Sequence, residues 1–383
     1  MNEKLIPLSV PTLAGNEWKY VKDCLDTGWI SSVGAYVTEF EKKVAEFTGA
    51  GYAVATVNGT AALHICLNMA GVGPDDHVII PNITFVATAN SVWYTGAEPI
   101  LIDTNLTDWQ MDLDILEKFL SKETTAKNGN LVFKKTGKVI RAIMPVHVLG
   151  NIFDMDRFLA IAEKYNLMVI EDSTEALGST YKGKHAGRFG PMGTVSFNGN
   201  KIISTGGGGM IITDDEALAK KAKHLTTTAK TDPLEYFHDE VGYNYRLVNV
   251  LAAIGVAQME QLPDFITRKK EVVQIYKDKL SGVADISFQE QSEDVTTNGW
   301  LFTIRTKHRP LLIQELNKRK IICRPFWTPM NQLPMHRNCH YINDHNHSSA
   351  LHMSGISIPS STSITNEEID RVVNNIKDII KHV

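Results

Sequence analysis

The sequence has few cysteines, little excess charge and no long uncharged apolar run, and each shortage argues against a class of protein. Its 383 residues contain four scattered cysteines and no C-x-x-C motif, which argues against a disulfide scaffold and a zinc ribbon. A formal net charge of −4 argues against a nucleic-acid-binding protein, which usually has a basic face. No uncharged apolar run is long enough to cross a bilayer, so we expect no membrane segment.

The beginning of the chain also lacks an apolar segment. Residues 1–19 are polar and contain nothing like the apolar core of a secretory signal peptide. Hydrophobic residues make up 43% of the chain and charged residues 21%, which is typical of a globular protein with a sizeable core. These features predict a cytoplasmic enzyme or binding protein.

Short apolar runs alternate with helical patterns from residue 51 onward. The apolar runs lie at 52–57, 77–81, 98–103, 139–146 and 167–172. Their alternation with helical spacing predicts an α/β fold with βαβ units and a mostly parallel, buried sheet. In such a sheet, functional residues are expected at the carboxyl ends of the strands.

The rest of the chain predicts a second, smaller unit. We interpret the polar residues 122–137 as a surface excursion and expect a long helix from about 247 to 280. Short apolar runs and two further helical patterns follow it. We therefore expect a large domain over residues 1–250 and a smaller C-terminal α+β domain over residues 251–383, begun by the long connecting helix.

Two motifs look like ligand sites but fit other interpretations better. Residues 178–184 have the G-x-x-x-x-G-K spacing of a P-loop, yet no Ser or Thr follows and Gly187 and Gly190 oppose a helix there. We expect a turn between two strands. Residues 336–347 contain four histidines and one cysteine, but their spacing matches no standard zinc motif. We interpret them as a polar surface loop and expect no metal.

An aspartate stands where a buried strand is expected to end. Asp172 closely follows the apolar residues 167–170. A carboxylate in that place would become protonated unless it met a cation or strong hydrogen-bond donors. It could cap a following helix, which is a common use of aspartate. Taken alone, that use is the favoured interpretation; the alternative is a partner for a cationic heterocycle.

The first strand-to-helix turn is a candidate anion site. Gly59 permits a tight turn, and free N–H groups at the start of the expected helix would lie beside the Thr60 hydroxyl. An ordinary capped helix is the alternative interpretation.

Lys201 lies among small polar residues, close to four consecutive glycines at 206–209. It could be an ordinary surface lysine. Its apolar neighbours Phe197 and Ile202 favour a desolvated site, where a lowered pKa would make the amine a nucleophile toward carbonyl carbons. A phosphate site, a carboxylate at a strand end and such a lysine are together what pyridoxal 5′-phosphate (PLP) requires.

These motifs, in this order, resemble the DegT/DnrJ/EryC1/StrS family of fold-type I sugar aminotransferases along nearly the whole chain. The matching segments are DTGWISS (26–32), NGTAALH (58–64), IIPNITFVATAN (79–90), VHVLGNIFDMD (146–156), EDSTEALGSTYKGKHAGRFG (171–190), SFNGNKIISTGGGGM (196–210) and GYNYR (242–246). The resemblance implies a fold-type I large domain, PLP as cofactor and transamination.

The resemblance also implies roles for individual residues. Lys201 would hold the cofactor as a Schiff base and later move a proton, and Asp172 would pair with the pyridine nitrogen. The residues expected to bind the cofactor are Gly59, Thr60, Ala61, Phe85, Asp172, Glu175, Ser196, Lys201 and Asn244. Among them, Phe85 would stack on the ring. Asn244 would reach the cofactor phosphate of a neighbouring subunit, which implies a homodimer with shared sites.

Glu175 departs from the family pattern, in which glutamine usually stands beside the phenolic oxygen of the cofactor. A glutamate can donate a hydrogen bond to that oxygen only when it is protonated. We therefore predict a raised pKa for Glu175.

The implied substrates are L-glutamate and a nucleotide-linked 4-keto-6-deoxy sugar. The sequence looks most like enzymes that act on UDP-4-keto-6-deoxy-N-acetylhexosamines of legionaminic acid- or bacillosamine-type routes. Arg246, Arg324 and Trp29 are candidate substrate-binding residues, although either arginine could instead form a structural ion pair.

Two alternatives to the aminotransferase are kept. One is a PLP-dependent nucleotide-sugar dehydratase of the same fold, which Lys201 disfavours because such relatives carry histidine there. The other is a non-catalytic regulatory protein that binds PLP or a nucleotide sugar.

Overall fold

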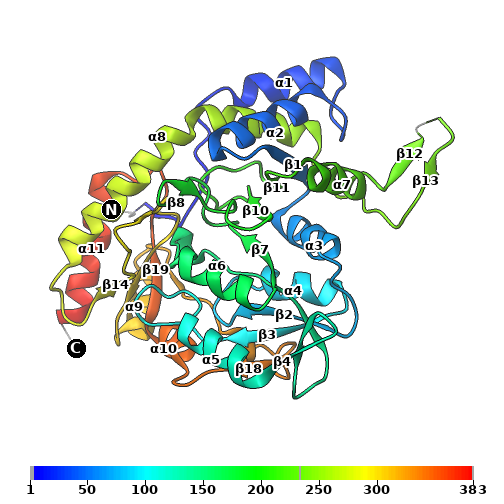
Figure 1. The fold of residues 1–383 in the computed structure, drawn as a ribbon. Helices are drawn as coiled ribbons and strands as arrows, with labels where there is room; N and C mark the ends of the chain where they lie inside the picture. The colour runs from blue at the N-terminus through cyan, green and yellow to red at the C-terminus, as the bar shows by residue number, and fades with distance from the viewer. Residues whose placement is uncertain (1–3, 233, 382–383) are drawn as a thin grey trace.

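The computed structural model describes residues 4–232 and 234–381, and a large sheet runs through the centre of the molecule (Figure 1). The strands of its main path follow the order β1-β11-β10-β7-β6-β2-β3-β18. In that order they are β1 (Tyr52–Thr56), β11 (Gly209–Thr213), β10 (Met192–Ser196), β7 (Met168–Asp172), β6 (Val139–Ile143), β2 (Asp76–Pro81), β3 (Glu98–Ile102) and β18 (His340–Ile342).

Most of this sheet is parallel, as the sequence predicts. Every pair from β10 to β18 is parallel, whereas β11 is antiparallel to both of its neighbours. Side chains alternate between the two faces, so that Val78 and Ile80 pack into one core and Ile79 packs into another. The sheet is therefore covered on both faces, and its strand ends are left to build a site.

Helices cover each face of the sheet. The helices α3 (Gly59–Met69), α4 (Ala87–Tyr94) and α7 (Glu216–Thr226) pack on one face. The other face is covered by α5 (Leu113–Glu123), α6 (Met155–Lys164), α2 (Ala35–Thr48) and α8 (Asn249–Leu280). The N-terminal helix α1 (Glu17–Thr27) packs on α8 and ends at Gly28, whose φ of 75° suits a glycine C-cap.

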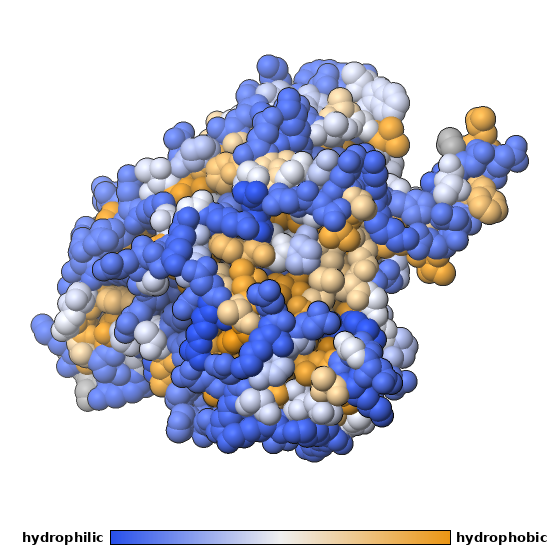
Figure 2. Space-filling model, viewed as in Figure 1, coloured by the Kyte–Doolittle hydropathy of each residue, from blue (hydrophilic) through white to orange (hydrophobic). Residues whose placement is uncertain are grey.

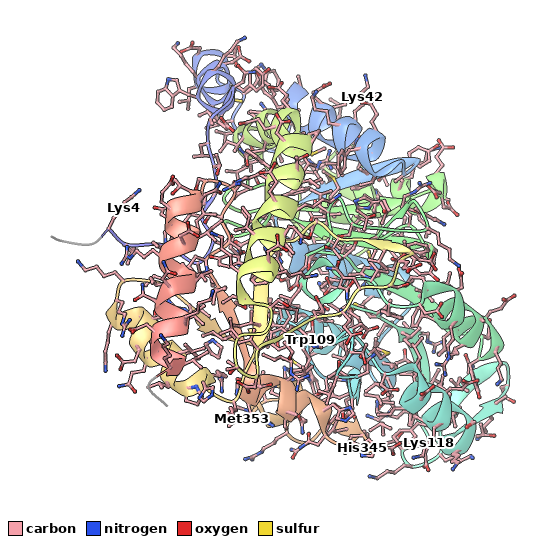
Figure 3. The ribbon with its side chains drawn as sticks, turned by 90° about the vertical axis from the view of Figure 1, so that its left-hand side faces the viewer. Lys4, Lys42, Trp109, Lys118, His345 and Met353 are labelled. Carbon is pink, nitrogen blue, oxygen red and sulfur yellow. The ribbon has the colours of Figure 1, made fainter. Side chains whose placement is uncertain are left out.

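The C-terminal residues form a smaller α+β layer. A four-stranded antiparallel sheet has the order β14-β16-β19-β17. Its strands are β14 (Ser287–Phe288), β16 (Phe302–Arg305), β19 (Gly355–Ile358) and β17 (Arg324–Pro325). The helices α9 (Arg309–Lys318) and α11 (Asn366–Lys381) share its core with the C-terminal half of α8, and α11 lies beside α8 (Figure 3). The division at residue 250 stays a prediction.

The expectation of a polar surface excursion at 122–137 is correct for most of its side chains, which are exposed, but wrong for the apolar run Leu131, Val132 and Phe133, which is buried. The segment forms a hairpin of β4 (Thr124–Lys127) and β5 (Asn130–Phe133), and β5 pairs with β6. Asn128 and Gly129 have φ values of 51° and 77°, as a two-residue hairpin turn of primed type requires. The Asn-Gly pair beside an apolar Leu-Val-Phe run was the sequence signal that the polar composition obscured.

The expectation of a surface loop at 336–347 is also wrong in part. His336 is fully buried, and its Nδ1 accepts a hydrogen bond of 3.0 Å from the Trp93 indole. Strand β18 then extends the large sheet by pairing in parallel with β3. The 3₁₀ turn η2 (Met330–Gln332) and α10 (His347–Ser354) flank this segment. The other residues of 336–347 are exposed or half-buried, so the segment lies at the surface as the edge strand of the large sheet and its flanking turns.

The segment with P-loop spacing is a turn between two short strands, as predicted. Strands β8 (Thr180–Tyr181) and β9 (Lys184–His185) pair antiparallel, and β15 (Val295–Thr296) joins β8. Among the described residues, no helix combines the length and the apolar character needed to cross a membrane.

A narrow arm projects from the body of the molecule (Figure 1). It carries β12 (Lys230–Asp232) and β13 (Phe237–His238), which pair antiparallel. Figure 2 shows apolar side chains near its tip, where Leu234, Tyr236 and Phe237 are all exposed. These side chains have little to pack against within one chain.

Candidate active site

A cavity of about 720 Å³ lies at the carboxyl ends of several strands of the large sheet. The turn after β1, the segment after β2, and the ends of β7 and β10 form one wall. Residues of the C-terminal layer form the other wall. Of the residues assigned from sequence, the cavity is lined by Gly59, Thr60, Phe85, Asp172, Glu175, Ser196, Lys201 and Arg324, which we call the cavity group.

The turn before α3 is a tight backbone site. The Asn58 side chain caps the helix by accepting a hydrogen bond of 2.8 Å from the Ala61 N–H. A Cβ on Gly59 would lie 3.1 Å from the Ser196 Cβ and 3.2 Å from the Thr174 Cγ2. Glycine therefore lets Ser196 approach the start of α3. Ala61 is buried and does not line the cavity. Its N–H is already used by the Asn58 side chain.

The glycine run after Lys201 brings β11 against this turn. A Cβ on Gly209 would lie 2.5 Å from the Asn58 carbonyl carbon and 2.6 Å from the Gly59 nitrogen. Gly206 and Gly208 have φ values of 80° and 130°, in the region that favours glycine. The glycines thus let two backbones touch and fix the position of the helix start.

Asp172 ends β7 and is held by two threonines. Its Oδ2 accepts a hydrogen bond of 2.7 Å from the Thr88 hydroxyl. Its Oδ1 accepts from the Thr174 hydroxyl at 2.7 Å and from the Thr174 N–H at 3.2 Å. The carboxylate caps a local turn and no helix follows it, so the helix-cap alternative does not describe its role. Neither threonine was singled out from the sequence.

Lys201 is buried, which excludes the surface-lysine interpretation. Its side chain is 10% exposed, and its Nζ lies 3.9 Å from the Glu175 Oε1. Burial lowers the pKa of Lys201, while the Glu175 and Asp172 carboxylates oppose that decrease. The amine therefore loses its proton more readily than an exposed lysine, as the sequence predicts.

Glu175 is the titratable neighbour of Lys201. Burial raises the pKa of Glu175 to about 7, although the Lys201 charge and a hydrogen bond of 2.8 Å from the Leu149 N–H to its Oε2 act in the opposite direction. The predicted direction is confirmed. Near neutral pH a large fraction of Glu175 is protonated and can donate a hydrogen bond.

On the wall from the C-terminal layer, the sequence singled out Arg324 but neither of two tryptophans. Trp300 and Trp327 stack with their ring centres 6.3 Å apart, and both line the cavity. Arg324 lines it from the same side, with its Nη1 donating to the Cys323 carbonyl at 3.1 Å. Phe85 lies on the opposite wall and is 55% exposed. In the sequence, Trp300 looked only like the first residue of an apolar strand.

Besides Ala61, three residues assigned from sequence lie outside this cavity: Trp29, Asn244 and Arg246, which we call the remote group. Trp29 and Arg246 line a second cavity of about 640 Å³. Arg246 is buried, pairs with Glu41 and donates to the Ala55 carbonyl at 3.2 Å, so within one chain it forms the structural ion pair. Asn244 is exposed and pairs with Thr227, which lines the second cavity.

The cavity group fits PLP. The narrow turn at Gly59 leaves backbone N–H groups and Ser196 free to approach a phosphate, and Asp172 presents a fixed carboxylate across the cavity from it. The Lys201 amine lines the same cavity and is the nucleophile that the aldehyde of PLP requires. Fold and site together define a PLP-dependent enzyme of fold type I.

Comparisons with known proteins agree with this class. The sequence profile of the DegT/DnrJ/EryC1/StrS aminotransferase family matches residues 11–377, so the chain belongs to that family and is a PLP-dependent sugar aminotransferase. A GDP-perosamine synthase of Escherichia coli O157:H7 is 38% identical over 378 residues, covering 98% of each chain. The GDP-perosamine synthase of Caulobacter vibrioides is 38% identical and covers 96% of each.

A solved structure shares the fold over most of its length. The DegT DnrJ EryC1 StrS aminotransferase from Brucella abortus superposes with a TM-score of 0.87 and 25% identity, covering 95% of each chain. The fold-type I architecture expected from the sequence is therefore confirmed.

Proposed function

We propose that this protein transfers the amino group of L-glutamate to C4 of a nucleotide-linked 4-keto-6-deoxy sugar, giving a 4-amino-4,6-dideoxy sugar. The observation that supports it most is that Lys201, Asp172 and the start of α3 line one cavity. Its volume is within the ~300–1,000 Å³ usual for small-molecule sites. The same cavity would receive the two substrates in turn.

Lys201 is the residue on which this reaction depends most. PLP, when bound, supplies an aldehyde for an amine and a ring that accepts electrons from the neighbouring carbon. In the amine form favoured by burial, Lys201 Nζ can remove the proton from Cα of glutamate. In the second half of the reaction the same atom would donate a proton to C4 of the sugar. A base held inside the cavity needs no diffusion step for either transfer.

Asp172 and Glu175 set the charge around the cofactor ring. Asp172 is fixed by Thr88 and Thr174, so its negative charge stays at one place and favours a protonated ring nitrogen. Glu175, when protonated, would donate to the phenolic oxygen that glutamine contacts in other members of the family. Both residues orient the ring without leaving their own hydrogen bonds.

For the nucleotide, the relatives favour a revision of the sequence-based expectation. The motifs led us to expect a UDP-linked sugar, whereas two relatives that cover nearly the whole chain are GDP-perosamine synthases. We therefore propose GDP as the first nucleotide to test and UDP as the second. Arg324 is the arginine that lines the cavity among the described residues, and we propose that it contacts the anionic part of the substrates.

We further propose a homodimer in which the remote group of one subunit completes the site of the other. The support is that Trp29 and Arg246 line a cavity separate from the one that holds Lys201. The projecting arm also exposes Leu234, Tyr236 and Phe237, apolar side chains that a second copy could cover. A cytoplasmic location remains part of the proposal, since the four cysteines are unpaired, as is usual in a reducing compartment.

The test is a substrate panel. Purified protein with PLP is incubated with L-glutamate and with GDP-, UDP- or dTDP-linked 4-keto-6-deoxy sugars, and the C4 configuration of the product is determined by NMR. We expect an amino sugar from the GDP substrate and none with Lys201→Ala. A wild-type protein that binds PLP but aminates none of these sugars would contradict the proposed substrate class.

A further inference from the structure

We propose that Trp300 is a catalytic residue whose indole face receives the Lys201 ammonium group whenever that lysine is not bonded to the cofactor. The Lys201 Nζ lies 4.0 Å from the centre of the Trp300 ring. This is well inside the ~6 Å at which an aromatic face attracts a cation. The proposal rests on the assignment of Lys201 as the lysine that binds the cofactor.

The ring is fixed to the turn that carries the lysine. The Trp300 indole N–H donates a hydrogen bond of 2.7 Å to the carbonyl of Asn200, the residue directly before Lys201. Trp300 is 3% exposed, so its ring has little freedom to turn away. The aromatic face therefore stays in one place beside the lysine turn while the Lys201 amine exchanges partners.

The same short segment also holds Glu175. The backbone N–H of Trp300 donates a hydrogen bond of 3.0 Å to the Asn298 Oδ1. The side-chain amide of Asn298 in turn donates one of 2.8 Å to the backbone carbonyl of Glu175. On its other side, the Trp300 carbonyl accepts a hydrogen bond of 2.7 Å from the buried Lys269 ammonium. Trp300 is thus held by three hydrogen bonds, and through Asn200 and Asn298 it is linked to the backbone next to Lys201 and at Glu175.

A buried lysine that moves protons needs support for its charged form. Burial alone favours the neutral amine, which could then take up a proton only at a high free-energy cost. The groups that face Lys201 Nζ are the Glu175 carboxyl at 3.9 Å, the more distant Asp172 carboxylate, Arg324 across the cavity and the Trp300 face. When Glu175 is protonated, its attraction is lost and the Trp300 face still favours the ammonium form.

The test measures how readily Lys201 takes up a proton, without using turnover. The full chain is loaded with pyridoxamine 5′-phosphate, which has no aldehyde and leaves Lys201 free. The pH dependence of Lys201 acylation is then followed by peptide mass spectrometry. The midpoint is the pH at which the acylation rate of Lys201 is half its maximum. We expect it to fall by about one pH unit in Trp300→Leu and by less in Trp300→Phe, which keeps an aromatic face.

Trp327→Leu is the matched control, because this tryptophan lines the same cavity and stacks on Trp300. Its midpoint should equal that of the wild type. An unchanged midpoint in Trp300→Leu, or an equal decrease in Trp327→Leu, would overturn the proposal.

A second series keeps the shape of the ring and so avoids any folding defect of the leucine variant. Tryptophans with one, two or three fluorines at position 300 have a progressively weaker negative face, and the midpoint should fall with each fluorine. A constant midpoint across the series would also overturn the proposal. The cofactor assignment is checked separately, because bound PLP should protect Lys201 from acylation. Failure of that assignment is therefore distinguishable from failure of the role of Trp300.

Discussion

The cavity group and the remote group were assigned from the same sequence, but the fold treats them differently. The cavity group opens into one cavity, and all its members except Arg324 lie on segments near the strand ends of the large sheet. The remote group lies beside another cavity, and its arginine is already paired with Glu41. The large sheet is enough to assemble the first group except Arg324, because its strand ends share one edge. The second group can serve the same chemistry only if another copy brings it there.

The largest expected effect comes from removing the centre of the cavity group. Lys201→Ala loses both the covalent and the proton-transfer role, so transamination should fall by at least about 10⁴-fold. The visible absorbance of the bound cofactor should also be lost. Lys184→Ala is the control, because this exposed lysine belongs to the β8–β9 hairpin. Equal activities of the two variants would show that the cavity group is not the catalytic centre.

Asp172→Asn should have the next largest effect. The amide can keep hydrogen bonds with Thr88 and Thr174 but carries no charge for the ring nitrogen, so turnover should fall about 10²–10³-fold. Stopped-flow measurement of the reaction with glutamate checks it. Asp112→Asn is the matched control, since Asp112 only caps α5 and asparagine caps as well as aspartate. Full activity of Asp172→Asn would support the capping role instead.

Hybrid dimers test the remote group directly. Asn244→Ala removes one hydrogen-bonding side chain from the partner's site and should lower activity about 10- to 100-fold. Purified hybrids of one Lys201→Ala subunit and one Asn244→Ala subunit should then regain about half of the wild-type activity, because one of the two sites is intact. Hybrids of Lys201→Ala with Asp172→Asn should stay inactive, since both residues belong to the cavity group. Equal activity of the two hybrids would contradict the distinction between the groups.

Glu175→Gln should lower transamination less than the other variants do. It tests whether Glu175, a member of the cavity group, contacts the cofactor ring. The pKa of Glu175 is raised to about 7, so this group is protonated below that pH and acts only as an acceptor above it. The visible band of the wild-type holoenzyme should therefore change across neutral pH, and the glutamine variant should lack that step. An absorbance titration measures both. Identical titration curves would mean that Glu175 does not contact the ring.

The cavity group was predictable because its signals are local. Buried parallel strands appear in the sequence as apolar runs, so the amino-acid pattern alone places Asp172 at a strand end, whereas Ser196 was assigned through the family resemblance. The start of α3 and the lysine turn are likewise short motifs. The α/β fold followed from the same alternation.

The opposite wall of the cavity could not be predicted in this way. Trp300 meets Asn200 across 100 residues of sequence, and nothing in its own neighbourhood indicates that contact. Strand β18 also joins the large sheet from a distant part of the chain. The role that we propose for the remote group requires a second subunit, and neither the sequence periodicity nor one folded chain determines how two subunits would pack.

The central claim is that Lys201 is the amine that holds the cofactor. It is tested most directly by reducing the PLP-loaded wild-type protein with borohydride and locating the pyridoxyl group by peptide mass spectrometry. The account predicts the label on Lys201 and its loss when L-glutamate is added before reduction. A label on another lysine, or none on a protein that has taken up PLP, would contradict it.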